Sequence, residues 1–195
     1  AEQTISVVFS TADADLQGTI ELYDPGNNLL GSASAANPGE MALLDSVAAG
    51  DAGDYRLDVS NLAGEGAFAA KIILNAAVEQ ETAGGSDNNT IASAQELAAS
   101  AINLPGGGLR YSALGLTQSG EADYYRLDLA EGDTTLFGLK AVQVNAGSGL
   151  RLELMDSDGK LIALGETGIG TFDQAIGVLT APAGGTLSLI HISEP

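Results

Sequence analysis

The sequence predicts an all-β protein made of two tandem modules. Apolar and polar residues alternate in short runs such as Tyr55-Arg-Leu-Asp-Val-Ser60, the 26 glycines supply tight turns, and the stretch at 20–31 returns 132 positions later at 152–163. Alternation with a period of two is typical of half-buried strands, and a long internal repeat is typical of arrayed modules. The chain of 195 residues is therefore expected to hold two domains. Each would have roughly 90 to 110 residues, enough to bury a core.

The repeated stretch is expected to be a β-hairpin. Its copies read Ile20-Glu-Leu-Tyr-Asp-Pro-Gly-Asn-Asn-Leu-Leu-Gly31 and Leu152-Glu-Leu-Met-Asp-Ser-Asp-Gly-Lys-Leu-Ile-Ala163. Each copy alternates, turns at Asp, Gly and Asn or Ser, and continues as an apolar strand. The same offset aligns Ala49-Gly-Asp-Ala-Gly53 with Ala181-Pro-Ala-Gly-Gly185, so the repeat extends past the hairpin.

Further strands are expected on both sides of the hairpins. In Tyr55–Ser60 the alternation places Tyr55, Leu57 and Val59 on one face. Apolar residues three positions apart at 91, 94 and 97, with a cap at Asn89 or Thr90, predict one short helix at 90–98. The other expected strands are 4–9, 41–48, 67–74, 110–116, 123–129, 134–144 and 174–180.

Composition shifts set the expected boundaries. The first module covers 1–75, a polar, Gly-rich linker covers 76–89, and the second module covers 90–186. Ala1 aligns with Ala130 rather than with a domain start, so we expect the first module to lack its opening strands. The second module is expected to lack its true closing strand, because residues 187–195 abandon the repeat.

These last nine residues, Leu187-Ser-Leu-Ile-His-Ile-Ser-Glu-Pro195, resemble the translation of a transposase adapter used in sequencing libraries. We expect this tail to be non-native, in which case His191 carries no functional argument. The alternative is a real strand, since Leu187 and Leu189 alternate acceptably with their neighbours.

The net charge of −19, from 7 basic and 26 acidic residues, disfavours nucleic acid and anionic membranes as partners. Cations are the natural partners, although acidity that only keeps the surface soluble is an equally good interpretation. No apolar run approaches the roughly 18 residues needed to cross a bilayer, so we expect no membrane insertion.

The sequence does not predict an enzyme. It has no cysteine, and it offers no serine paired with a native histidine as nucleophile and base. A carboxylate-pair glycosidase is disfavoured because tryptophan is absent and aromatic residues are few. Asp156-Ser-Asp-Gly159 is similar to the opening of a calcium loop, but Thr167 stands where the bidentate Glu belongs, so a hairpin turn is favoured.

Ordered motifs across almost the whole chain resemble one known family. Gly120-Glu-Ala-Asp-Tyr-Tyr-Arg-Leu-Asp-Leu-Ala-Glu-Gly-Asp133, then the second hairpin, then Thr180-Ala-Pro-Ala-Gly-Gly-Thr186, are similar to the bacterial pre-peptidase C-terminal (PPC) domain family. The resemblance implies two tandem jelly-roll-like β-sandwich modules, here both incomplete. It also implies a non-catalytic role and an extracellular or cell-surface location, because such domains are appended to secreted proteases and large surface proteins.

The resemblance also implies a metal site. In calcium-binding relatives, acids and amides of the linker meet acids of the D-Y-Y turn. The matching residues here are Asp87, Asn88, Asn89, Glu121 and Asp123. The alternative is that these residues form ordinary solvated turns.

Two functions remain open. The first is an accessory module that acts as a spacer or binding module in a larger secreted or surface bacterial protein. The alternative is a calcium-dependent domain of a secreted protease that binds a polysaccharide, another carbohydrate or an extracellular matrix protein, with neighbouring domains of the parent chain as further partners. The few candidate contact aromatics slightly favour the spacer, and Tyr124 and Tyr125 should point to opposite faces. The other candidates are Tyr23 and Tyr111.

Overall fold

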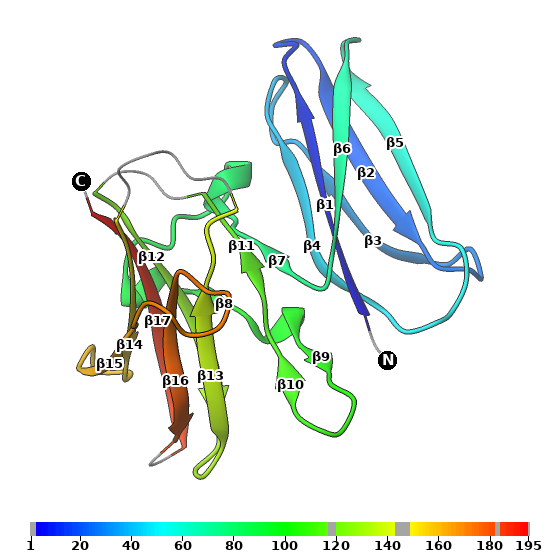
Figure 1. The fold of residues 1–195 in the computed structure, drawn as a ribbon. Helices are drawn as coiled ribbons and strands as arrows, with labels where there is room; N and C mark the ends of the chain where they lie inside the picture. The colour runs from blue at the N-terminus through cyan, green and yellow to red at the C-terminus, as the bar shows by residue number, and fades with distance from the viewer. Residues whose placement is uncertain (1–2, 117–119, 143–148, 182–183, 195) are drawn as a thin grey trace. The chain divides into compact units, whose positions relative to one another are not determined.

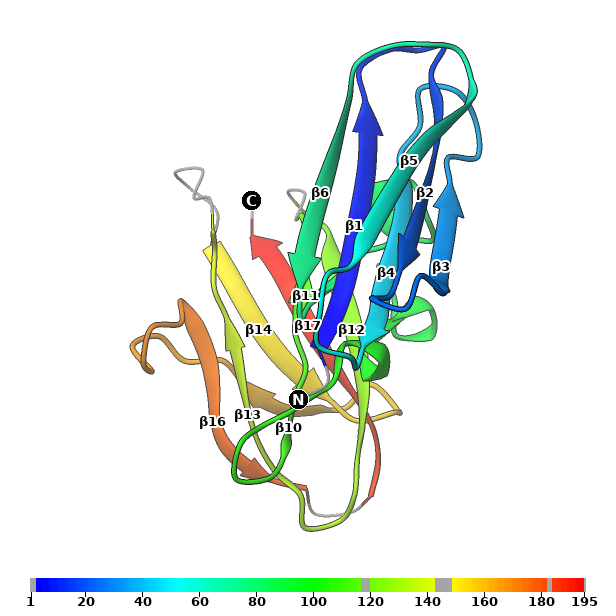
Figure 2. The ribbon, with the colours of Figure 1, turned by 90° about the vertical axis from the view of Figure 1, so that its right-hand side faces the viewer.

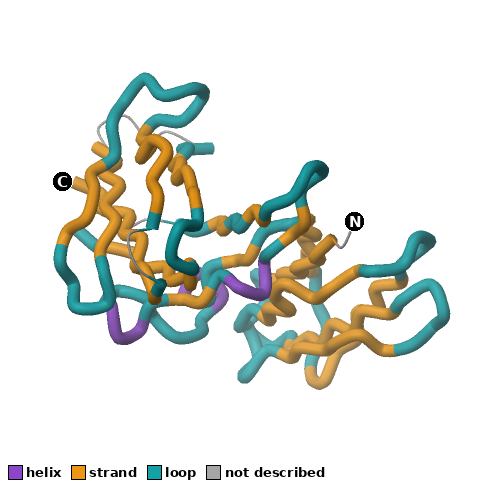
Figure 3. The backbone as a smooth tube through the Cα atoms, turned by 90° about the horizontal axis from the view of Figure 1, so that it is seen from below, coloured by secondary structure: helices purple, strands orange, loops and turns teal. Residues whose placement is uncertain are grey.

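The all-β prediction is confirmed. The computed structural model describes residues 3–116, 120–142, 149–181 and 184–194, with side chains placed as far as Leu189. Strands dominate, and the described helical structure consists of three 3₁₀ turns of three residues each (Figure 3). The chain divides into two compact units. The first contains Ala1–Ser86 and Leu97–Gly115, and the second contains Asp87–Glu96 and Leu116–Pro195.

The first unit is a sandwich of two three-stranded antiparallel sheets (Figure 1). One sheet has the order β4-β1-β6 and the other β3-β2-β5. The strands are β1 (Gln3–Thr11), β2 (Gln17–Tyr23), β3 (Leu29–Ser34), β4 (Ala42–Ala49), β5 (Arg56–Ala63) and β6 (Phe68–Leu74).

Alternating apolar residues fill the space between these sheets. Val7 and Phe9 of β1 and Ile20 of β2 are almost completely buried, and Leu22 and Leu44 join the same cluster. In β5 and at the residue before it, positions 55, 57 and 59 are half-buried while 56, 58 and 60 are exposed, as the alternation predicts.

The second unit pairs a five-stranded sheet, in the order β15-β14-β17-β12-β8, with the two-stranded sheet β13-β16. Leu152 and Leu154 of β14 and Ala175 of β16 are its most deeply buried apolar residues. The strands are β8 (Gln95–Glu96), β12 (Ala122–Leu129), β13 (Thr134–Leu139), β14 (Gly149–Met155), β15 (Leu161–Leu164), β16 (Gln174–Thr180) and β17 (Gly185–Glu194).

The internal repeat is a structural repeat, and it preserves the strand register. In the first hairpin Leu22 pairs with Gly31 and, after a bulge, Tyr23 pairs with Leu29. In the second, Leu154 pairs with Ala163 and, after the same bulge, Met155 pairs with Leu161. Each of these four residues in the first hairpin is 132 positions before its equivalent in the second, so the two hairpins have the same register and the same bulge.

The strand β17 occupies the place in the second unit that β5 occupies in the first. Leu22 pairs with Leu57, and the equivalent Leu154 pairs with Leu189. Residues 185–194, most of which the sequence assigned to a non-native tail, therefore run as a central strand between β14 and β12. The structure therefore has a strand where the sequence predicted a missing one, with Leu187 and Leu189 half-buried and Ser188 buried.

The connecting segment differs from the expected free linker at 76–89. Ala76, Ala77 and Val78 are buried, and β7 (Ala77–Val78) pairs in parallel with β11 (Ala113–Leu114). Residues 97–115, expected in the second module, belong to the first unit. Two-residue parallel pairs leave no periodicity in a sequence, so the alternation could not reveal this return.

The expected single helix at 90–98 is wrong in detail. Thr90 caps η2 (Ile91–Ser93) through its hydroxyl, which accepts from Ser93 N at 3.2 Å, as the sequence suggested. β8 then follows, and η3 (Ala98–Ser100) and η1 (Glu81–Ala83) are further 3₁₀ turns.

The expected strand at 110–116 is likewise divided. It becomes β10 (Leu109–Arg110), which pairs with β9 (Ile102–Asn103), and the separate β11. The strand expected at 134–144 ends at Leu139, and residues 143–144 lie outside the described residues.

Candidate functional site

The five predicted calcium ligands all belong to the second unit, and part of the set lies beside β12. The main chain of Asn88 accepts a hydrogen bond from Tyr124 N at 2.8 Å. The Asn88 side chain donates through Nδ2 to Tyr124 O at 3.3 Å, and Asn88 is only 2% exposed. The structure therefore holds the segment that starts at Asn88 against the strand containing Asp123.

Besides Asn88, the Asp123 side chain and the Oδ1 atom of Asn89 are withdrawn from solvent in this region. Asp123 is 4% exposed. Asn89 Oδ1 is buried and accepts no hydrogen bond from the described part of the chain. Burying an amide oxygen without a donor is unfavourable, and such an oxygen suits a hard cation such as calcium.

The remaining two predicted ligands do not complete a carboxylate cage. Asp87 is exposed and Glu121 is half-buried. Among the described residues, no group of three or more His, Cys, Asp or Glu side chains is placed to hold a metal ion. The Asn89 oxygen is a ligand of the kind that calcium prefers, whereas the described carboxylates form no group of three around one point.

The rest of this segment is tied to the same strand. Gln95 and Glu96 of β8 pair in parallel with Tyr125 and Arg126 of β12, and Arg126 Nε lies 3.1 Å from Glu96 Oε2. Tyr125 is buried whereas Tyr124 is half-buried, so only one of the two tyrosines is a core residue, as predicted.

The acidic turns of the two hairpins are structural, as the sequence favoured. Asp24 Oδ1 accepts from Asn28 N at 2.8 Å, and Asp156 Oδ1 accepts from Lys160 N at 2.9 Å at the equivalent position. The Asn28 side chain and backbone donors hold the pKa of Asp24 below its ordinary value. Both carboxylates therefore satisfy turn amides.

A polar cluster in the first unit was not predicted. Asp45 Oδ1 accepts from Ser6 Oγ at 2.9 Å, from Ser46 Oγ at 3.1 Å and from Val78 N at 2.9 Å. Ser6 Oγ also accepts from Ser46 N at 2.9 Å and lies 2.8 Å from Ala76 O. The cluster forms at the β-bulge between β1 and β4, and it fastens residues 76–78 to that sheet.

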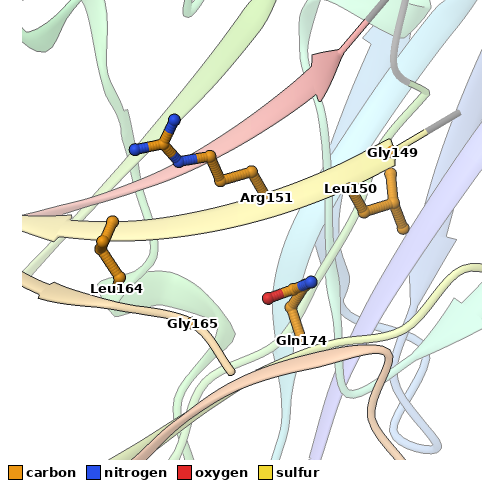
Figure 4. Close-up of a pocket in the computed structure, with 6 residues that line it drawn as sticks. All are labelled: Gly149, Leu150, Arg151, Leu164, Gly165 and Gln174. Carbon is orange, nitrogen blue, oxygen red and sulfur yellow. The ribbon is translucent and has the colours of Figure 1, made fainter. Parts of the chain in front are cut away.

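A cavity of about 300 Å³ opens beside β14 in the second unit (Figure 4). Arg151, Leu164 and Gln174 contribute to its lining. The Arg151 guanidinium is already paired, with Nη2 at 2.6 Å from Glu153 Oε1. Among the described lining residues there is no nucleophile paired with a base.

Comparisons with known proteins do not place this chain in a family. No protein-family model matches the sequence, and no curated protein matches it. Within the described ranges, no helix has the length and apolar character needed to span a membrane.

Proposed function

We propose that this chain provides non-catalytic accessory β-sandwich repeats of a larger secreted or cell-surface bacterial protein, acting as a spacer. The observation that carries the proposal is that one strand plan occurs twice with the same register and the same bulge. Repeating a module extends a protein without requiring a new fold, which is what a spacer needs. The motifs that resemble PPC domains support the extracellular assignment.

Parts of the connecting segment are paired within one unit or the other. Residues 77–78 and 113–114 are paired within the first unit, and residues 95–96 are paired within the second. Paired backbone is poor substrate for proteases compared with a free linker. Limited proteolysis is therefore expected to spare residues 77–78, 95–96 and 113–114 until a unit unfolds, and early cleavage at these residues would contradict the proposal.

A binding array separates a spacer from a binding module. The chain is screened against immobilised polysaccharides and extracellular matrix proteins. A spacer gives no saturable signal, whereas a ligand with a dissociation constant in the micromolar range, about 8 kcal/mol, would show a binding module instead.

Calcium-dependent binding is the second candidate function, and the buried, unsatisfied Asn89 Oδ1 favours it. Calcium that binds only the folded chain stabilises it by about 2.7 kcal/mol at a hundredfold excess over the dissociation constant. The melting temperature of the second unit is compared in calcium, magnesium and chelator.

Two variants and one control sharpen this measurement. Asn89→Leu and Asp123→Asn should each abolish the calcium-dependent rise, because they remove an oxygen ligand or its charge. Asp158→Asn, in an exposed hairpin turn, should leave the rise unchanged. An equal effect of magnesium, or no effect of calcium, would rule out a specific site.

A further inference from the structure

The two units differ at one sheet edge. In the second unit β17 has β14 on one side and β12 on the other. In the first unit the equivalent strand β5 pairs with β2, and no described strand pairs with its other edge. An unpaired edge presents main-chain donors and acceptors to any extended segment that fits it.

The surroundings of this edge are apolar and open. Across the sandwich from β5 lies β6, the edge strand of the other sheet (Figure 2). Ile72 and Leu74 of β6 are 58% and 57% exposed. They line a cavity of about 360 Å³ together with Leu57 of β5 and Tyr55, which directly precedes β5. Large apolar side chains that point into the space between the two sheets yet remain exposed indicate a surface that binds a partner.

The second unit shows which strand fits such an edge. β12 pairs antiparallel with β17, with Tyr125 opposite Leu189 and Leu127 opposite Leu187. Tyr125 and Leu127 are buried. In the repeat, Leu189 corresponds to Leu57 and Leu187 to Tyr55. A strand with β12's inward residues would thus place a tyrosine against Leu57 and a leucine against Tyr55.

The outward positions call for different charges from those of β12. Arg126 lies opposite Ser188, which corresponds to Arg56, and Asp128 lies opposite Thr186, which corresponds to Asp54. Copied onto β5, these residues would set like charges opposite each other, which is destabilising. A fitting partner therefore keeps the apolar alternation but carries an acid opposite Arg56 and a base opposite Asp54.

We propose that the free edge of β5 and the apolar cavity between β5 and β6 form a binding site for an extended peptide strand, added antiparallel to β5. The inward residues of the strand are aromatic and aliphatic at the positions of Tyr125 and Leu127. Its outward residues complement Arg56 and Asp54. Main-chain hydrogen bonds supply affinity, and the alternate side chains supply specificity.

The probe is a synthetic peptide with the sequence of residues 120–130 carrying Arg126→Glu and Asp128→Lys. It is titrated into the 195-residue chain, with binding measured by calorimetry and the bound site located by hydrogen exchange. The expected result is saturable binding that protects the amides of β5. A peptide that also carries Tyr125→Asp and Leu127→Asp should not bind.

Ile72→Lys tests the cavity, since a lysine there meets the inward face of the added strand. It should weaken binding by roughly tenfold or more, because the charge would lose its water. Ile72 is exposed, so the melting temperature of the free variant should stay close to that of the parent chain. Leu29→Lys, at an exposed residue on the opposite edge strand β3, is the matched control and should bind normally.

Four results would overturn the proposal. They are no saturable binding, binding unaffected by Ile72→Lys, protection outside β5 such as exchange of the peptide with β12, and concentration-dependent protection of β5 without peptide. The last result, with a dimer in sedimentation, would show that the occupant is a second copy of the chain.

Discussion

Replacing Asp45 with alanine tests the polar cluster that holds residues 76–78 on the first unit. One carboxylate oxygen accepts from two hydroxyls and from the main chain of Val78. The Ser6 hydroxyl retains Ala76 O as an acceptor at 2.8 Å. Val78 N donates to this carboxylate at 2.9 Å, and Val78 is 5% exposed.

The expected cost follows from the hydrogen bonds lost with the carboxylate. A hydrogen bond to a charged group contributes about 1.5–3 kcal/mol. For a domain of about this size, each kcal/mol lowers the melting temperature by roughly 4–8 °C. Asp45→Asn keeps an oxygen acceptor and should cost less than Asp45→Ala. Urea unfolding of the first unit measures the loss, and hydrogen exchange at Val78 locates it.

The control is Asp58→Ala, which removes an acid from an exposed ion pair with Arg56. Exposed pairs contribute about 0–1 kcal/mol, so this change should be nearly neutral. Equal losses for Asp45→Ala and Asp58→Ala, or unchanged exchange at Val78, would refute the role given to the cluster.

Three further changes have expected outcomes. Leu154→Ala, at a fully buried residue, should destabilise the second unit by about 2–5 kcal/mol in chemical denaturation, whereas Leu164→Ala, 47% exposed, should be nearly neutral. Gly18→Ala should cost about 1–3 kcal/mol in thermal unfolding, because the added Cβ meets the ring of Phe9. The Asp24 carboxyl group, whose pKa is lowered by hydrogen bonds from Asn28, should titrate below the usual aspartate pKa when followed by NMR. Its stabilising effect should be present above about pH 4 and be lost as the pH falls through the lowered pKa, and Asp24→Ala should abolish this dependence.

Local patterns predicted the hairpins well. Alternation, turn chemistry and the repeat offset are all short-range signals, and they placed both hairpins and the Thr90 cap. The division of the chain between units depends on non-local pairing, which such signals do not record. Residues 97–115 were therefore grouped with their sequence neighbours rather than with the first unit.

A comparison of the two repeats could have predicted the polar cluster from the sequence. The bulge between β1 and β4 recurs between β13 and β16, and the positions of Ser6 and Ser46 are taken there by Leu136 and Val178. Leu136 is 48% exposed and Val178 is 75% exposed. The first unit thus has serines at two positions where the second unit has apolar residues. This difference indicates that the same face of the sheet packs against a different segment in the first unit, namely residues 76–78.

The sequence could not show how the five predicted calcium ligands are arranged in space. These residues were chosen because the sequence resembles PPC domains. Such a resemblance identifies candidate ligands but does not give the distances between them. Burial of Asn88 and Asp123 depends on how the segment packs beside β12, and the exposure of Asp87 follows from the same path.

The path of the chain between the units has a consequence for dissection of the protein. The chain passes from the first unit to the second after Ser86, returns after Glu96, and leaves again after Gly115. A single cut anywhere between these points leaves one fragment carrying a segment that folds with the other. A continuous piece that contains one whole unit, 1–115 or 87–195, therefore also carries a segment of the other unit. Only rejoining 1–86 to 97–115, or 87–96 to 116–195, by a new linker would give one unit free of the other's residues.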